Sequence, residues 1–292
     1  MMEFPAKNYD LAATLASGQA FRWRLIGHAW EGVIGKHWVR LRQEQDRIIA
    51  QTAGPAGNWD WLPHYLQLSI DLNQIFATFP PDEPMRRSMQ SCAGLRLLRQ
   101  EPWECLASFI CSSTKQITQI QQIVALLCRR FGRPAAVPDG HEPVYSFPGF
   151  RTLAEVTERD LRECKLGFRA PYLLNSAKKL RDGEINLSAL PRLSLEEARA
   201  RLMQLPGVGL KIADCVLLFG FGFQQAFPVD VWVMRALRDL YFAKRPVKLP
   251  RLREFSQTHF GPHSGYAQQY LFHYMRTKGR KRGSLNIDTG QK

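Results

Sequence analysis

The chain has 292 residues, and its 40 Lys and Arg outnumber its 26 Asp and Glu, which gives a formal net charge of +14 and a pI near 9.8. This balance favours a polyanionic partner, above all nucleic acid, and the length allows two domains or one large one with a sizeable core. No stretch approaches the roughly 20 apolar residues of a membrane span, and MMEFPAKNYD lacks the layout of a signal peptide.

The N-terminal part alternates aromatic or apolar side chains with polar ones over residues 19–53, with three glycines as breaks. Such period-two alternation predicts an antiparallel sheet of several short strands. From about Trp59 the bulky side chains are spaced by three and four, as in a helix, until prolines interrupt the chain at 80–84. We therefore predict a small antiparallel sheet domain with a trailing helix over 1–85.

Nearly everything after this domain is predicted to be helical, so the fold class is α+β. The expected helices span 103–112, 115–131, 152–164, 169–182, 194–204, 209–222, 229–242, 250–259 and 264–277. We assign 86–277 to a helical body with a helix-hairpin-helix motif at 194–222. The remaining 278–292 form a basic tail that we expect to be mobile, because a solvated, frayed end is commoner than a phosphate-binding tail.

Cysteines are scattered through these predicted helices and never form a C-x-x-C pair. They are Cys92, Cys105, Cys111, Cys128, Cys164 and Cys215. Metal sites and disulfide frameworks need clustered ligands, so we interpret all six as buried free thiols and expect no metal and no organic cofactor.

The run LPGVGLKIADCVLLFGFGFQQAFPVDVWVMRAL, residues 205–237, combines a sharp turn with two reactive groups. Gly207, Val208 and Gly209 form a hairpin whose backbone amides can approach a phosphate closely. Lys211 follows in the first turn of an apolar helix, where its surroundings favour an uncharged, nucleophilic amine. Asp230 opens the next helix nineteen positions later.

Each reactive residue also has a plain structural interpretation. Asp230 could be only a helix N-cap, and Lys211 only a surface or phosphate-binding lysine. The hairpin and the spacing together favour catalysis, and a capped helix N-terminus would help to keep Asp230 ionised. Asp214, near the start of the same helix as Lys211, is interpreted as structural support rather than as the acid-base group.

This stretch resembles the helix-hairpin-helix, Gly/Pro-Asp motif of the base-excision DNA glycosylases, in the branch whose catalytic lysine also nicks the strand. Four further segments, in the same order, resemble the 8-oxoguanine DNA glycosylases. They are SGQAFRWR (17–24), FICSSTKQITQI (109–120), LGFRAPYL (166–173) and GYAQQYLFHYMR (265–276). The branch with a four-cysteine iron–sulfur cluster is disfavoured, because no cysteine follows Cys215.

The resemblance implies how a flipped base would be held. Cys215 and Phe272 would sandwich the base, and Gln268 would contact its Watson–Crick edge. The backbone carbonyl of Gly18 would accept a hydrogen bond from the N7–H that guanine gains on oxidation. Spacing supports the two pairs, since Cys215 is at i+4 from Lys211 and Phe272 at i+4 from Gln268. Separately, Cys215 and Phe272 could be core residues, Gln268 a surface residue and Gly18 a turn.

The residues expected to hold the base opposite the lesion depart from the family pattern. Thr114 and Gln119 stand where the family commonly has asparagine and arginine, whereas Arg169 is retained. Trp232 stands where histidine is usual, which removes one expected phosphate contact. We therefore expect a relaxed preference for the opposite base.

The resemblance implies a bifunctional DNA glycosylase and abasic-site lyase that excises 8-oxoguanine from duplex DNA. Lys211 would attack C1′ to form a Schiff base, β-elimination would break the strand, and Asp230 would take the amine's proton or stabilise the oxocarbenium-like sugar. The alternatives are an alkylated-base glycosylase of the same superfamily and a non-catalytic helix-hairpin-helix module that binds DNA. We expect an intracellular monomer with duplex DNA as partner, in the cytoplasm and nucleoid of a prokaryote or otherwise in a nucleus.

Overall fold

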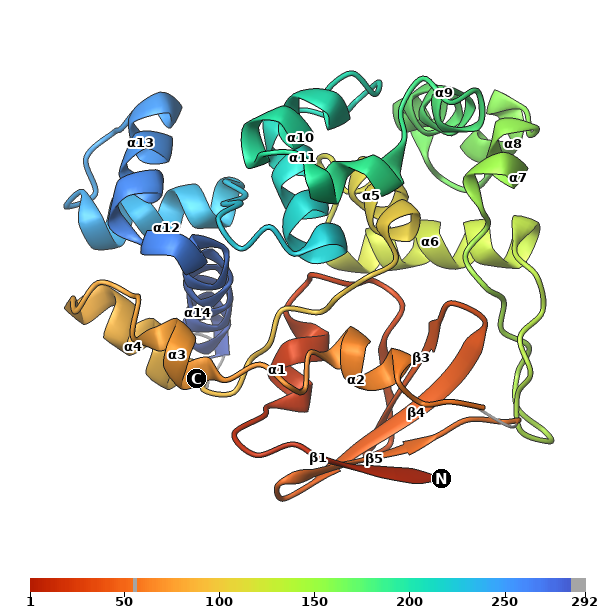
Figure 1. The fold of residues 1–292 in the computed structure, drawn as a ribbon, viewed down its shortest axis with the longest axis horizontal. Coiled ribbons are helices and arrows are strands. Elements are labelled where there is room, and N and C mark those ends of the chain that lie inside the picture. Colours follow the sequence, from red (N-terminus) through yellow and green to blue (C-terminus); the bar gives the residue numbers. More distant parts are fainter. Residues whose placement is uncertain (55–56, 285–292) are drawn as a thin grey trace, which may run out of the picture.

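The computed structural model describes residues 1–54 and 57–284, and side chains as far as Thr277, as a sheet beside a helical body (Figure 1). Five antiparallel strands in the order β1-β5-β4-β3-β2 form the sheet. They are β1 (Met2–Pro5), β2 (Arg24–Ile26), β3 (Ala29–Ile34), β4 (His37–Glu44) and β5 (Arg47–Gln51). The predicted sheet is confirmed, but β1 was not predicted because it is a mostly exposed edge strand without alternating burial.

Alternation along β4 and β5 creates the core of the sheet part. Val39, Leu41 and Ile48 are fully buried beneath helices α1 (Leu11–Ala16) and α2 (Trp61–Leu66). Burial of side chains at every second position explains why the period-two pattern predicted these strands well.

The helical body contains twelve helices that follow α2 within the described residues. They are α3 (Leu72–Phe76), α4 (Glu83–Ser91), α5 (Pro102–Cys111), α6 (Ile117–Phe131), α7 (Phe150–Ala154), α8 (Glu158–Glu163), α9 (Ala170–Arg181), α10 (Leu195–Leu202), α11 (Leu210–Val216), α12 (Val231–Tyr241), α13 (Leu249–His259) and α14 (Ser264–Ser284). Short helical turns are η1 (Gly167–Arg169), η2 (Leu187–Arg192), η3 (Leu217–Phe221) and η4 (Gly261–His263).

Three of the predicted helix boundaries were wrong. The single helix expected over 152–164 is two helices, because Thr157 adopts an extended conformation and caps α8 through the Asp160 amide. The helix expected over 209–222 changes to a π turn at Leu217. The last helix continues past Thr277 to Ser284, so the predicted mobile tail starts too early; its remainder, 285–292, lies outside the described residues.

Packing interleaves the two parts of the molecule. Leu72 and Met85, from the segment assigned to the sheet domain, belong to the core of the helical body, and α4 packs against α14 (Figure 1). Leu98, which follows these residues in the chain, packs in the core of the sheet part. The domain boundary at residue 85 therefore remains a prediction, and the chain crosses between the two cores more than once.

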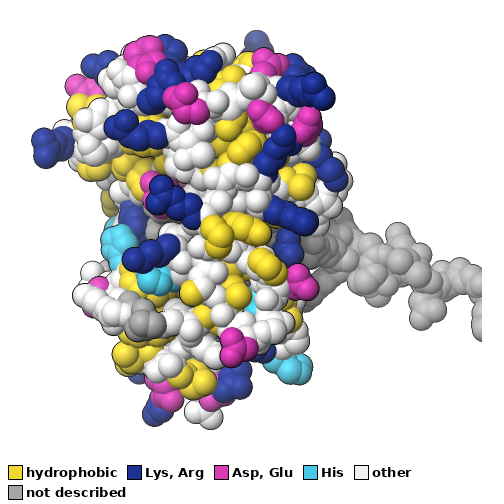
Figure 2. Space-filling model, turned by 90° about the vertical axis from the view of Figure 1, so that its right-hand side faces the viewer, with side chains coloured by type: hydrophobic (Ala, Val, Ile, Leu, Met, Phe, Trp, Pro, Cys, Tyr) yellow, Lys and Arg dark blue, Asp and Glu magenta, His cyan; other side chains and the backbone are white. Residues whose placement is uncertain are grey.

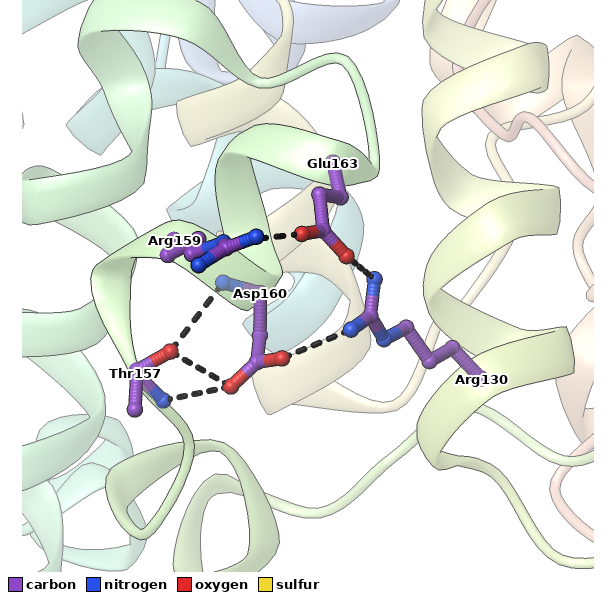
Figure 3. A network of polar contacts seen from close by, with 5 residues as sticks. All are labelled: Arg130, Thr157, Arg159, Asp160 and Glu163. Atoms are coloured by element: carbon purple, nitrogen blue, oxygen red, sulfur yellow. Dashed lines mark hydrogen bonds and ion pairs between the residues drawn. The ribbon is translucent and has the colours of Figure 1, made fainter.

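An ion-pair network joins the end of α6 to α8 (Figure 3). Arg130 of α6 contacts Glu163 and lies 2.6 Å from Asp160, and Arg159 binds the other oxygen of Glu163 at 3.3 Å. These side chains are largely exposed, so each pair contributes little to the stability of the fold. The network links the end of α6 to α8, which precedes η1 in the chain.

The surface on the right-hand side of Figure 1 carries Lys and Arg among acidic side chains rather than in one basic patch (Figure 2). All six cysteines are free and buried, as predicted. Across the described ranges there is no group of three or more His, Cys, Asp or Glu side chains that could hold a metal ion. In the same ranges, no helix has the length and apolar character needed to cross a membrane.

Candidate active site

The predicted hairpin joins α10 to α11. Gly207 has a φ of +75°, and a Cβ there would lie 2.7 Å from the ring of Tyr172, so this position requires glycine. Gly209 has a φ of −92°, and a Cβ there would meet nothing within 4 Å, so the protein itself does not require glycine at this position. The Val208 amide donates to the carbonyl of Leu205 at 3.1 Å, so that amide closes the turn.

Lys211 lies half-buried in the first turn of α11 and points toward the end of α5. Its Nζ donates to Ser112 Oγ at 3.4 Å and lies 4.9 Å from the centre of the Phe109 ring. The amine is therefore placed by a hydroxyl and an aromatic face about one hundred residues earlier in the chain. The sequence contained both residues in the segment FICSSTKQITQI, but no local pattern connected them to Lys211.

Asp230 is the N-cap of α12, as predicted. Its Oδ1 accepts a hydrogen bond from the Val233 amide at 2.8 Å. Burial raises the pKa of the Asp230 carboxyl, and the Val233 amide and the Lys211 charge oppose this rise. The helix N-terminus thus favours the carboxylate, while burial raises its pKa.

Asp214 supports the structure, as predicted, and faces away from this chemistry. Its Oδ1 accepts a hydrogen bond from Arg199 Nε at 2.7 Å, which ties α11 to α10. Burial raises the pKa of Asp214, and the Arg199 charge opposes the rise. Asp214 and Asp230 therefore differ in their partners: Asp214 binds the Arg199 side chain, and Asp230 binds the Val233 amide.

The proposed base pocket has two sides on α11 and α14. Cys215 on α11 is buried one turn after Lys211, and burial raises the pKa of its thiol to about 12. Gln268 on α14 is 4% exposed, and its Oε1 has no hydrogen-bond partner among the described residues. A buried acceptor without a partner is costly unless a ligand satisfies it.

Gly18 lies close to Phe272, the second proposed pocket residue on α14. It has a φ of +81°, and a Cβ there would lie 2.8 Å from Ile117 Cδ1 and 3.6 Å from the Phe272 ring. Gln269 of α14 donates to the carbonyl of Ser17 at 3.1 Å, which holds the glycine turn in place. The structure therefore brings Gly18 and Phe272 together.

Two residues near this turn were not singled out from the sequence. Arg276 donates to the carbonyl of Ala16, and its guanidinium lies 5.6 Å from the centre of the Phe272 ring. Gln19 is fully buried and accepts from the Leu98 amide at 2.7 Å. The i+4 spacing of Phe272 and Arg276 could have revealed the first. The second depends on a contact 79 residues away, for which the sequence carries no signal.

The residues predicted to face the opposite base each make a side-chain hydrogen bond within the protein. Arg169 is 3% exposed and binds Thr114 Oγ1 at 2.6 Å. Gln119 is exposed, but its Oε1 accepts from the Gln116 amide at 3.0 Å at the start of α6. The structure thus brings Thr114 and Arg169 together and gives Gln119 a capping contact.

Exposed apolar side chains flank this region. Phe168 is 53% exposed and its ring lies 4.1 Å from the guanidinium carbon of Arg169, while Tyr172 is 39% exposed beside the hairpin. Trp232 is 37% exposed, next to Asp230. Phe168 was not predicted, because its significance depends on the exposure of its ring beside Arg169, which the sequence does not show. A cavity of about 920 Å³ between the sheet and α6 is lined by none of the predicted site residues.

The comparisons with known proteins agree with this arrangement. Residues 107–257, a range that includes the hairpin, Lys211 and Asp230, match the HhH-GPD superfamily of base excision DNA repair proteins. Residues 1–106 match the N-terminal domain of 8-oxoguanine DNA glycosylase. The chain therefore belongs to the 8-oxoguanine DNA glycosylases of that superfamily.

Individual relatives cover nearly the whole chain. An N-glycosylase/DNA lyase of Arabidopsis thaliana is 34% identical over 92% of this chain and 79% of its own length. The 8-oxoguanine glycosylase/lyase of Clostridium acetobutylicum, solved with duplex DNA containing cytosine opposite 8-oxoguanine, is 31% identical, with a TM-score of 0.88 over 96% of this chain and 99% of that one. A 3-methyladenine DNA glycosylase of Archaeoglobus fulgidus, 23% identical with a TM-score of 0.79 over 95% of this chain and 99% of that one, shares the fold.

Proposed function

We propose that the protein is a bifunctional DNA glycosylase and abasic-site lyase that excises 8-oxoguanine from duplex DNA inside the cell. The observation that carries the proposal is the position of a half-buried lysine and an aspartate at the starts of two helices, Lys211 in the first turn of α11 beside Ser112 and Asp230 as the N-cap of α12. Similarity to glycosylase/lyases over nearly the whole chain supports it.

In the proposed reaction, the Lys211 amine attacks C1′ of the flipped nucleotide and the bond to the base breaks. Asp230 stabilises the positive charge that develops on the sugar or takes the proton that the amine loses. The sugar ring opens to a Schiff base on Lys211. Loss of a proton from C2′ then expels the 3′ phosphate by β-elimination, which nicks the strand.

The proposed recognition of the base uses the pocket between α11 and α14. Gln268 Oε1, buried without a partner, would accept a hydrogen bond from the Watson–Crick edge of the flipped base. The Gly18 carbonyl would accept from N7–H of 8-oxoguanine, a donor that guanine lacks. Phe272 and Cys215 would stack on the two faces of the ring. Arg169, Thr114 and Gln119 would lie on the side of the opposite base.

The amides of the hairpin around Gly207 and Gly209 would bind the DNA backbone, with the helix start of α11 favouring a phosphate. Phe168, exposed beside Arg169, would then fill space in the duplex after the base has been flipped.

Incubation of the purified protein with labelled duplexes tests the function. We expect base release and strand cleavage with 8-oxoguanine opposite cytosine, and cleavage of a duplex with an abasic site. Excision of an alkylated purine instead, without cleavage at the abasic site, would establish the alkylated-base alternative. Tight binding to all duplexes without reaction would establish a non-catalytic DNA-binding module.

A further inference from the structure

The Arg169 side chain binds the same turn after α5 that the candidate catalytic lysine contacts. Arg169 reaches from η1 to the turn that follows α5, where it contacts Ser113 and Thr114. The preceding residue in that turn, Ser112, accepts the hydrogen bond from Lys211. The guanidinium and the candidate nucleophile therefore contact consecutive residues of one turn.

Most of the hydrogen-bond donors of Arg169 are already used. Its Nε donates to the carbonyl of Ser113 at 2.9 Å, and its Nη1 donates to the carbonyl of Leu166 at 3.1 Å. Its Nη2 donates both to the Ser113 carbonyl and to Thr114 Oγ1, the latter at 2.6 Å. A guanidinium has five N–H groups. Within the described part of the chain, these contacts leave a single N–H, on Nη1.

Thr114 keeps this arrangement at a conformational cost. Its φ is +55°, in the left-handed region that a β-branched residue rarely adopts. The residue is exposed, so no packing of its side chain compensates for the strain. The observed compensation is the charge-assisted hydrogen bond from Arg169 to its hydroxyl.

We propose that Thr114 is a specificity-determining residue that prevents Arg169 from reading the opposite base with two hydrogen bonds. The proposal rests on the function proposed above. Cytosine presents two adjacent acceptors, O2 and N3, which a guanidinium with two free N–H groups contacts together. Thymine presents O2 beside an N3–H donor, so it satisfies one such group but repels a second. With one free N–H, Arg169 discriminates weakly between the two bases.

Three variants of Thr114 separate the hydroxyl from the shape of the side chain. Thr114→Gly removes the hydroxyl and suits the positive φ, and Thr114→Val removes it while keeping the branched shape. Thr114→Ser keeps the hydroxyl and serves as the matched control. Single-turnover excision of 8-oxoguanine opposite cytosine and opposite thymine is measured for each at one salt concentration. The rate opposite cytosine divided by that opposite thymine is the measured quantity.

We expect the glycine and valine variants to raise this ratio on the order of tenfold, which is the effect of one base-edge contact. The serine variant should keep the ratio of the wild type. In Thr114→Gly/Arg169→Gln the gain should disappear, which shows that it depends on Arg169. A purely structural role of Thr114 would change both rates together and leave the ratio unchanged.

An unchanged or lower ratio in both variants without the hydroxyl, with an active wild type, overturns the proposal and leaves the proposed function intact. A higher ratio in the serine variant as well would show that the hydroxyl is not responsible, and also overturns it. Borohydride trapping of the wild type on abasic-site DNA tests the proposed function separately. Absence of both trapping and excision in the wild type would overturn that function, and this inference with it.

Discussion

The two sides of the candidate active site differ in how their polar groups are satisfied. In the base pocket, the buried Oε1 of Gln268 has no partner among the described residues, and Gly18 is packed so closely against Ile117 that a Cβ would not fit. On the other side, Arg169 donates to two carbonyls and to Thr114, and Gln119 caps α6. A buried acceptor without a partner indicates a site where a ligand supplies the missing hydrogen bond. Donors that already have partners must rearrange before they can bind a base, or they contact it with few hydrogen bonds.

Residues whose type and position suit contact with a base therefore differ in whether their hydrogen-bonding groups are free to make that contact. The base pocket should therefore be strict, and the opposite-base side permissive. This contrast can be tested with variants of the candidate catalytic residues, of the base pocket and of the residues on the opposite-base side.

The largest expected effect is the loss of the covalent intermediate in Lys211→Gln. Glutamine keeps a polar end but has no amine that could form a Schiff base. Borohydride should trap the wild type on lesion DNA and should not trap the variant, while a binding assay shows similar affinity for both. Lys115→Gln, in the turn beside Ser112, is the matched control and should trap like the wild type. Equal trapping in Lys211→Gln would place the nucleophile elsewhere.

Asp230→Asn should slow base excision about 100- to 1,000-fold, because a neutral amide cannot stabilise the developing positive charge. Asparagine is as good an N-cap as aspartate, so the melting temperature should stay near that of the wild type. Asp214→Asn is the control: it weakens a buried ion pair with Arg199 and should lower the melting temperature more than Asp230→Asn. A matching loss of stability and activity in Asp230→Asn would favour the capping role alone.

Gly18→Ala should reduce excision of 8-oxoguanine about 10- to 100-fold. A Cβ at position 18 would lie 2.8 Å from Ile117 in a left-handed backbone conformation, which costs about 1–2 kcal/mol and displaces the carbonyl. Cleavage of DNA with a preformed abasic site should change little, because no base is read. A similar loss on both substrates would show that the substitution disturbs the whole site rather than base recognition.

The pH dependence of excision should reflect the buried carboxyl. Burial raises the pKa of Asp230 above that of an ordinary aspartate, and the reaction needs its ionised form. Activity should therefore be lost as the pH falls through this raised pKa, about tenfold for each unit below it. The single-turnover rate against pH measures this acidic limb, and the limb should be absent from Asp230→Asn. Its persistence in that variant would assign it to another group.

Gln119→Arg should have the smallest effect, a preference for cytosine increased on the order of tenfold. Arginine adds a base-edge donor on the permissive side but removes the contact with the Gln116 amide. Rates opposite C, T, G and A at one salt concentration measure the change. Loss of the capping contact should lower the free energy of unfolding by about 1 kcal/mol, which would appear as a small drop in melting temperature. A wild type that is already strictly dependent on cytosine would contradict the expected permissiveness.

Much of the fold could be predicted because its signals are local. The alternation in β3, β4 and β5 and the three- and four-residue spacing in helices such as α6 and α9 follow directly from which side of each element is buried. The edge strand β1 and the break between α7 and α8 were missed, because the first pairs with a strand more than forty residues away and the second depends on the Thr157 cap.

For the site, local sequence was enough to predict the candidate reactive pair, because the hairpin, the spacing of Lys211 and Asp230 and the N-cap position of Asp230 all involve neighbouring residues. Only the tertiary structure decided which groups are free to act. It placed Ser112 against Lys211 and engaged Arg169 with Ser113 and Thr114, across separations of 99 and at least 55 residues. Hydrogen bonds between distant residues leave no periodic pattern, so their effect on availability appears only once the chain is folded.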